Sequence, residues 1–357
     1  MRDIHIRQAI KEKNVRWIDV RSPGEYETAT VPGAVNIPLF DNEERAQIGT
    51  VYKKEGRETA VRLGMEIVSP KIPRLVDTVL SHSMGRTPLL FCWRGGMRSR
   101  ALATFLDLAQ HPVLRLEGGY RSYREYVVER LSDEPLTSRM IVLHGLTGVG
   151  KTALLHRLKA LGAPVLDLES LAGHRGSAFG SLGELRPRNQ RMFDSYLLEQ
   201  LERYKDEPYL FMEAESKRIG RVHLPDFLER AKKEGIPVLV EASATVRVNH
   251  ILDTYLGESG NPERFRQQLA GSIRRIERRL SPDTRKNLWQ WIAKEEYRPL
   301  VQALLREYYD PRYRHSLEQY EGRFALRIRS DDPDSAARKL REFHRHLIGE
   351  KPAKILL

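Results

Sequence analysis

Two short stretches decide the fold of this chain: residues 89–100, LLFCWRGGMRSR, and residues 145–152, GLTGVGKT. In each, an apolar run that suits a buried strand ends in a glycine-rich turn, and a helical pattern follows. Strand, turn and helix in this order build parallel α/β sheets, where chemistry gathers at the carboxyl ends of the strands. The sequence therefore predicts two α/β domains, each with a functional turn.

Composition limits the class of protein. The chain has 357 residues and is 40% hydrophobic, which is enough for two globular domains with cores of their own. Its net charge of +12 favours a polyanionic partner, although a soluble protein can be this basic without one. A single cysteine argues against an oxidising compartment, and no signal-peptide core or membrane-spanning run is evident. We expect a soluble cytoplasmic protein without a membrane partner.

Hydrophobic periodicity extends both predicted domains. The first domain covers residues 1–131 and a polar linker covers residues 132–138. Its strands are expected at Trp17–Val20, Pro88–Phe91 and Val113–Leu116, with a turn-rich segment at Ser22–Leu39 and a helix at Arg98–Leu108.

The second domain covers residues 139–357. Its strands are expected at Met140–His144, Pro164–Leu168, Tyr209–Glu213, Pro237–Glu241 and Arg323–Ile328. Its helices are expected from Lys151 and at Asn189–Tyr204, Leu224–Lys233 and Ser335–His346, with a strand-free helical extension over residues 262–309.

Cys92 is the only cysteine, so it has no disulfide partner within the chain and cannot form a zinc site of several thiolates. Five residues separate it from Arg98, and Gly95 and Gly96 allow the turn to direct amide N–H groups inward as an anion nest. These amides, Arg94 or Arg98, and the next helix N-terminus would favour a thiolate. We interpret Cys92, Arg94 and Arg98 as catalytic, the alternative being a buried structural thiol.

The stretch GLTGVGKT fits the phosphate-loop pattern G-x-x-x-x-G-K-[ST] in full. We expect amides around Gly145, Gly148 and Gly150 to cradle phosphates. Lys151 would add a positive charge, and Thr152 could reach a magnesium ion.

Glutamates stand where a nucleotide hydrolase would carry an aspartate, at the end of the strand Tyr209–Glu213. This departure argues against ordinary ATP hydrolysis and leaves room for a diphosphate ester. Three further segments are rich in functional side chains: DLESLAGHRGSAFGS at 167–181, ESKRIGRVHLP at 215–225 and YYDPRY at 308–313. The candidate substrate-site residues are Asp167, Glu169, His174, Arg175, Ser177, Glu213, Glu215 and Arg218, each of which could instead serve a capped turn or a solvated loop.

The segments DVRSPGEYETATVPGAVNIPL and CWRGGMRS resemble the two signatures of rhodanese-type sulfurtransferases. Two departures stand out. Ala29–Thr30 replaces the Gly-His of many rhodaneses, at a position that we expect to be structural. The Cys-x5-Arg loop is longer than in most single-domain rhodaneses and resembles that of rhodanese-related phosphatases. By hypothesis, a pocket of that size would admit selenophosphate.

Taken together, the motifs resemble those of the tRNA 2-selenouridine synthases, a family also called tRNA selenotransferases. They are, in order, DVRSPGEYE, DNEERAQIGTVYKKEG, CWRGGMRS, EGGYR, GLTGVGKT, DLESLAGHRGSAFG, ESKRIGRVHLP and YYDPRY. The resemblance implies a rhodanese-like domain followed by a P-loop NTPase-like domain with a helical extension. It also implies a bacterial enzyme that replaces the sulfur of wobble 2-thiouridine in tRNA with selenium, through S-geranyl-2-thiouridine.

The resemblance implies roles for both stretches and for the co-substrates. Cys92 would serve the selenium step, with selenophosphate as donor, and Gly145–Thr152 would hold geranyl diphosphate. No tightly bound cofactor is implied, and a magnesium ion could bind through Thr152. The partners would be tRNA carrying 2-thiouridine and an enzyme that supplies selenophosphate.

If tRNA is the substrate, the segment Arg264–Leu280 has a purpose. Phe265, Leu269, Ile273, Ile276 and Leu280 form an apolar stripe at helical spacing. The candidate tRNA contacts lie off that stripe and are Arg274, Arg275, Arg278 and Arg279, with Trp289 and Trp291 following. The alternative is a solvated helix with core tryptophans.

Two other functions remain open. One is a small-molecule sulfurtransferase or Cys-x5-Arg phosphatase fused to a kinase-like domain. The other is a non-catalytic RNA-binding protein.

Overall fold

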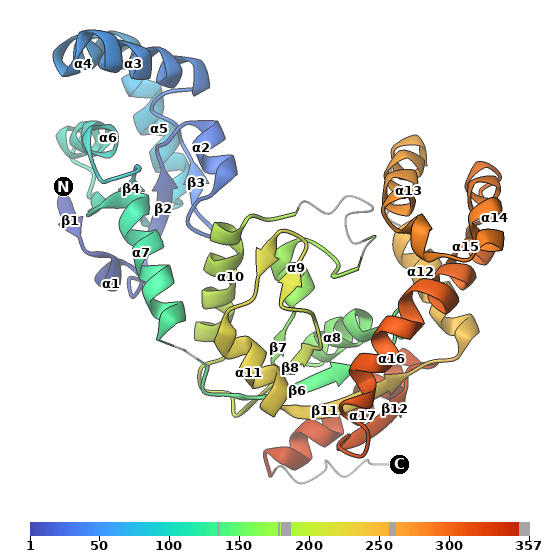
Figure 1. The fold of residues 1–357 in the computed structure, drawn as a ribbon. Helices are drawn as coiled ribbons and strands as arrows, with labels where there is room; N and C mark the ends of the chain where they lie inside the picture. Colours follow the sequence, from blue (N-terminus) through green and yellow to red (C-terminus); the bar gives the residue numbers. More distant parts are fainter. Residues whose placement is uncertain (134–135, 178, 180–186, 257–261, 350–357) are drawn as a thin grey trace. The chain divides into compact units, whose positions relative to one another are not determined.

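The computed structural model describes residues 1–133, 136–177, 179, 187–256 and 262–349 (Figure 1). The chain divides into two compact units, residues 1–134 with 191–199 and residues 135–190 with 200–357. Each unit contains a five-stranded sheet with helices packed on it, which confirms the predicted α/β class. The predicted linker falls at the division, with residues 134–135 outside the described residues.

The sheet of the first unit is parallel throughout. Its strand order is β1 (Arg2–Ile4), β5 (Leu114–Leu116), β4 (Thr87–Phe91), β2 (Val15–Asp19) and β3 (Val35–Asn36). Central strands of such sheets are apolar on both faces because helices cover them, and Leu89, Leu90 and Phe91 are completely buried. The helices are α1 (Ile6–Ala9), α2 (Pro23–Thr28), α3 (Asn42–Glu55), α4 (Arg57–Val68), α5 (Ile72–Ser83), α6 (Met97–Leu108) and α7 (Gly119–Ser132), with the 3-10 turn η1 (Ser69–Lys71).

The first unit holds helices that the sequence patterns did not predict. The turn-rich segment at Ser22–Leu39 contains α2, which begins with a capping box between Ser22 and Glu25. A helical insertion, α3 to α5, lies between β3 and β4. Because α3 buries none of its residues, it lacks the apolar periodicity that marks most helices.

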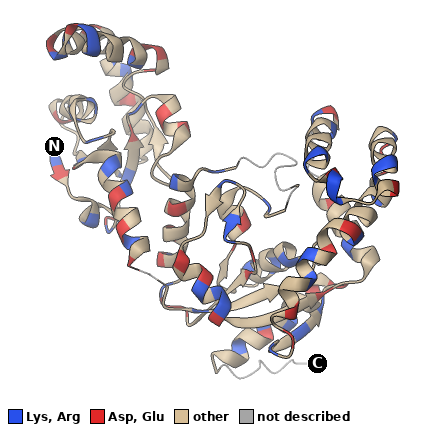
Figure 2. Ribbon diagram, in the orientation of Figure 1, with Lys and Arg blue, Asp and Glu red and all other residues tan. Residues whose placement is uncertain are grey.

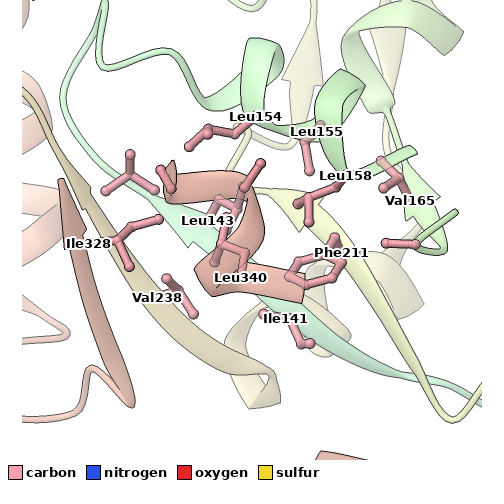
Figure 3. Close-up of a cluster of buried hydrophobic side chains, with 14 of the residues drawn as sticks. Ile141, Leu143, Leu154, Leu155, Leu158, Val165, Phe211, Val238, Ile328 and Leu340 are labelled. Carbon is pink, nitrogen blue, oxygen red and sulfur yellow. The ribbon is translucent and has the colours of Figure 1, made fainter. Parts of the chain in front are cut away.

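The sheet of the second unit is also parallel. Its order is β12 (Leu326–Arg329), β11 (Ile236–Glu241), β6 (Arg139–His144), β8 (Tyr209–Glu213) and β7 (Val165–Leu166). Against one face lie α8 (Lys151–Ala160) and α17 (Pro333–Leu347). Figure 3 shows Leu154, Leu155 and Leu158 of α8 and Leu340 of α17 meeting strand residues in this core. Close packing here fixes the start of α8, and with it the phosphate loop.

The remaining elements of the second unit are α9 (Leu168–Ala172), the hairpin strands β9 (Arg218–Ile219) and β10 (Val222–His223), and α11 (Asp226–Glu234). Among them, α11 agrees with the predicted helix at Leu224–Lys233, whereas the hairpin was not predicted. The predicted helix at Asn189–Tyr204 is α10 (Gln190–Arg203), of which residues 191–199 belong to the first unit. The predicted strand at Arg323–Ile328 is wrong at its start, because turn hydrogen bonds from Tyr320 to Leu317 and from Arg323 to Tyr320 delay β12 until Leu326.

The helical extension is confirmed and is longer than predicted. It consists of α12 (Ala244–Leu256), α13 (Pro262–Ile276), η2 (Glu277–Arg279), α14 (Pro282–Ala293), α15 (Tyr297–Leu304), the π-helical η3 (Leu305–Tyr309) and α16 (Asp310–Glu318). All five residues of the apolar stripe are buried in its core, so the predicted orientation of α13 is correct. Within the described ranges, no helix is both long and apolar enough to span a membrane.

Candidate functional site

The cysteine loop, residues 92–96, joins β4 to α6 and is held by the glycine turn that begins α7. The Tyr120 N–H donates to the Cys92 carbonyl at 2.8 Å, and the Arg121 N–H donates to the Trp93 carbonyl at 3.0 Å. Gly119 has a φ of +61°, and a Cβ there would lie 2.2 Å from the Cys92 carbonyl oxygen. Only glycine therefore permits this approach, which directs two loop carbonyls toward α7.

The thiol of Cys92 is buried and has two polar neighbours. The Gly96 N–H donates to its Sγ at 3.2 Å, and the Ser99 Oγ lies 3.3 Å from the same atom. The first turn of α6, which starts at Met97, adds the positive end of a helix dipole. The Cys92 sulfur therefore lies beside an amide N–H, a hydroxyl and the N-terminus of a helix.

The two predicted catalytic arginines are placed differently. Arg98 makes two hydrogen bonds to the Glu25 carboxylate, at 2.6 and 3.2 Å, whereas Arg94 is exposed on the loop. Burial by itself would raise the pKa of Glu25, but the bonds and charge of Arg98 outweigh it and lower that pKa. Arg98 would have to leave Glu25 to hold a phosphate, as the phosphatase alternative requires.

A buried ion pair, Arg21 with Asp19, lies next to the cysteine loop. The Arg21 Nε lies 2.9 Å from the Asp19 carboxylate, and the Thr30 hydroxyl donates to the same carboxylate at 2.8 Å. Arg21 also donates to the Ala29 carbonyl and lies 4.3 Å from the centre of the Tyr120 ring. The Ala29–Thr30 position is therefore structural, as expected.

The phosphate loop joins β6 to α8 and depends on its glycines. Gly145, Gly148 and Gly150 have φ values of +155°, +82° and +83°. A Cβ on Gly145 would lie 2.4 Å from the carbonyl oxygen of Val240. The Lys151 Nζ donates to the Gly145 carbonyl at 3.0 Å, so the lysine lies over its own loop.

Carboxylates gather beside Thr152. Its hydroxyl contacts Glu169 at 3.0 Å and Glu213 at 3.3 Å. Burial, followed by the charge of Glu169, raises the pKa of Glu213 well above its usual range. The same two causes, partly offset by Lys151, raise the pKa of Glu215 to about 7.

This oxygen set is suited to magnesium. Within the part of the chain that the structure describes, no group of three or more His, Cys, Asp or Glu side chains forms a metal site. A magnesium ion at a phosphate site, however, needs only one or two carboxylates, because ligand phosphates and water complete its shell. Thr152, Glu169 and Glu213 offer such oxygens.

The segment around His174 brings further predicted residues to these carboxylates. The Gly176 N–H donates to Glu169 at 2.6 Å, and a Cβ on Gly176 would overlap the Glu215 carboxylate at 1.9 Å. Ser177 lies 3.2 Å from the Tyr255 hydroxyl, and the Arg175 guanidinium lies 5.0 Å from the centre of the Tyr255 ring. The last residues of this motif, 178 and 180–181, lie outside the described residues.

Three predicted site residues have local structural partners. Asp167 caps α9 by accepting from the Ser170 N–H. The His174 ring lies against Gly220, where burial, the largest cause, lowers its pKa. Arg218 is exposed and donates to the Gly220 carbonyl.

The structure adds three residues that were not predicted as site residues. Arg247 donates to the Thr147 carbonyl of the phosphate loop at 2.8 Å and forms an ion pair with Asp310. The Tyr313 ring centre lies 5.8 Å from the Lys151 Nζ. Asp310 and Tyr313 lie in the motif YYDPRY, which the sequence analysis noted only as a segment rich in functional side chains. Arg247 lies in no such motif.

The basic segment of the helical extension faces solvent, as predicted. Arg274, Arg275, Arg278 and Arg279 are all exposed. The Arg274 guanidinium lies 5.7 Å from the centre of the Trp289 ring, which is 39% exposed, whereas Trp291 packs against the core. Figure 2 shows basic residues along α13.

Family models match both parts of the chain. The model described as tRNA 2-selenouridine synthase AAA domain matches residues 138–344, and the rhodanese-like domain model matches residues 5–126.

Curated relatives match across most of the chain. The tRNA 2-selenouridine synthase of Shewanella halifaxensis is 33% identical over 328 residues, covering 85% of this chain and 88% of the relative. That of Sulfurovum sp. is 30% identical over 363 residues, covering 94% and 97%. That of Hahella chejuensis is 33% identical over 340 residues, covering 87% of both.

Proposed function

The chain belongs to the tRNA 2-selenouridine synthase family, and on that premise we propose that it converts wobble 2-thiouridine in tRNA to 2-selenouridine in two steps. The observation that carries the proposal is the presence, in one chain, of a buried thiol loop and a phosphate loop flanked by glutamates. Each loop suits one anionic co-substrate: selenophosphate at Cys92 and geranyl diphosphate at Lys151.

The first step is prenyl transfer at the phosphate loop. The sulfur of 2-thiouridine attacks the C1 carbon of geranyl diphosphate, the C–O bond breaks with its electron pair leaving on diphosphate, and the uracil N3 proton goes to solvent. Loop amides and Lys151 stabilise the departing charge, and a magnesium ion held by Thr152, Glu169 and Glu213 would neutralise more of it.

An apolar cavity beside the phosphate loop supports a prenyl diphosphate over a nucleotide. The cavity measures about 70 Å³, and Thr147 of the loop contributes to its wall. The rest of the wall is largely apolar and includes Ile251, Leu252, Tyr255 and Leu300. A hydrocarbon chain suits these apolar side chains, and the cavity would have to widen to admit the ten carbons of a geranyl group.

The second step is selenium transfer at Cys92. The selenium of selenophosphate attacks C2 of S-geranyl-2-thiouridine, the C–S bond breaks, and geranylthiolate leaves and takes up a proton. Water then cleaves the P–Se bond, which yields phosphate and 2-selenouridine. The amides of the cysteine loop and Arg94 would bind the selenophosphate anion.

The partners follow from the substrates. The exposed arginines of α13 and η2, with Trp289, would contact tRNA through phosphates and base stacking. Because the second step consumes selenophosphate, an enzyme that makes selenophosphate must supply it.

The test is to incubate the purified protein with 2-thiouridine tRNA and geranyl diphosphate, with and without selenophosphate, and to weigh the nucleosides after digestion. We expect S-geranyl-2-thiouridine in the first reaction and 2-selenouridine in the second. No change of nucleoside mass with competent tRNA would refute the proposal. Turnover of thiosulfate and cyanide, or of a phosphate ester, would then support the small-molecule alternative.

A further inference from the structure

A large cavity lies in the first unit, under the helical insertion. It measures about 1010 Å³, at the upper end of the range for ligand pockets. Its walls come mainly from α3, α4 and α6. The helix α3 carries the motif DNEERAQIGTVYKKEG, to which the two steps above assign no role.

The wall of this cavity is mainly apolar. Ile48, Val61, Met65, Ala101 and Phe105 contribute to it, together with Met97 and Tyr52. Three of these large side chains are open to solvent: Tyr52 is 58% exposed, Met65 is 67% exposed and Met97 is 51% exposed. Exposed apolar side chains gathered around an open pocket are typical of interaction sites and ligand-binding grooves.

Cations are also part of this wall. Arg45, Lys53 and Arg57 are exposed and line the cavity together with the partly buried Arg98. Arg98 forms its ion pair with Glu25, and Arg45 lies 3.7 Å from the same carboxylate. One carboxylate thus serves two of the four cations, which leaves the lining with an excess of positive charge.

The cavity adjoins the cysteine loop through the first turn of α6. Met97 and Arg98 line the cavity, while Gly96 and Ser99, on either side of them, contact the Cys92 sulfur. The thiol and the cavity therefore share one helical turn.

We propose that this cavity receives the prenyl chain on the sulfur of S-geranyl-2-thiouridine in tRNA, an inference that rests on the proposed function. The occupant must combine a hydrocarbon with neighbouring anions, and a prenylated base within an RNA loop does so. Its chain would lie against the apolar wall and its phosphates against Lys53 and Arg57. Bare 2-thiouridine has no group that would fill such a space.

The test measures binding, so that it does not depend on turnover. S-geranyl-2-thiouridine tRNA and 2-thiouridine tRNA, both supplied as ligands, are titrated against the full chain without co-substrates. The wild type should bind the geranylated tRNA at least tenfold more tightly.

Two neighbouring residues of α3 provide a matched pair of variants. Ala46 is exposed and lines the cavity, whereas Gln47 is exposed and does not. Ala46→Trp should abolish the preference for geranylated tRNA without changing the affinity for 2-thiouridine tRNA, and Gln47→Trp should keep it. Met65→Glu, which places a charge in the cavity, should also abolish it.

The outcomes separate the two proposals. Equal binding of both tRNAs by the wild type, or a preference that survives in Ala46→Trp and Met65→Glu, would overturn the cavity assignment even if both chemical steps occur. A preference that only the cavity variants lose would uphold the assignment even if the turnover assay fails.

Discussion

The cysteine loop and the phosphate loop have the same local structure but differ in how the charges around them are arranged. Both join a buried parallel strand to a helix through glycines. Around the cysteine loop the charges are already paired, Arg98 with Glu25 and Arg21 with Asp19. Around the phosphate loop, carboxylates crowd Thr152, and Lys151 hydrogen-bonds loop carbonyls.

The difference indicates how each loop responds to its ligand. The first holds a buried thiol whose charged neighbours are already paired, and it needs no charge to be added. The second concentrates negative charge that a metal ion with a diphosphate would relieve. We therefore expect the two loops to fail in different ways when they are changed.

The largest effects should separate the loops by reaction step. Cys92→Ala should reduce 2-selenouridine formation by about a hundredfold or more, because it removes the thiol at the proposed site of selenium transfer, while geranylation continues. Lys151→Ala should slow geranylation by roughly a hundredfold to a thousandfold. Selenation of supplied S-geranyl-2-thiouridine tRNA should persist in Lys151→Ala. Quantified nucleosides from each reaction provide the readout, and a variant that loses both steps equally would contradict the separation.

A smaller effect concerns the backbone that holds the cysteine loop. Gly119→Ala should destabilise the first unit by about 1–2 kcal/mol for the left-handed backbone and by about 1–3 kcal/mol more for the collision with Cys92. Gly33→Ala is the control, because Gly33 has a φ of +75° but a Cβ added to it would meet no atom within 4 Å. Thermal unfolding of both variants gives the comparison, and equal shifts of the midpoint would mean that the close approach to Cys92 has no energetic importance.

RNA affinity should change independently of both loops. Arg274→Glu with Arg278→Glu should weaken tRNA binding by about tenfold and reduce the salt slope by about one for each phosphate that the variant no longer binds. The control is Arg338→Glu with Lys339→Glu, an equal charge change at exposed positions of α17. Titrations at several salt concentrations measure both quantities. The same affinity and slope as the wild type would exclude α13 and η2 from the interface.

The smallest effect is a pH dependence confined to the phosphate loop. The pKa of Glu215 is raised to about 7, so its carboxyl is largely neutral below that pH and becomes anionic above it. Metal-free diphosphate binding should therefore weaken severalfold as the pH rises through about 7, and Glu215→Gln should reduce that change. Diphosphate binding to the wild type and to the variant is measured by calorimetry at several pH values. The ligand's own titration affects both proteins equally, so the difference between the two pH profiles reports the contribution of Glu215. Identical profiles would show that Glu215 does not sense the ligand.

Local patterns were sufficient to predict most strands and both loops. The runs at Pro88–Phe91 and Met140–His144 are apolar because both faces of their sheets are covered, and glycines must follow where the chain turns sharply. The stripe of α13 was visible for a similar reason, since burial on one side imposes a helical period. The helix α3 buries nothing and was therefore missed.

Whether two residues meet is decided by folding, because contacts such as Arg98 with Glu25 join positions 73 residues apart. Residue types at 92–98 and 145–152 were enough to indicate a thiol and a phosphate cradle. Only the tertiary structure showed that Arg98 pairs with Glu25 and that Glu169 and Glu213 both contact Thr152. It also showed that Arg247 contacts the phosphate loop. Such pairings depend on which strands lie adjacent, and no local pattern encodes that order.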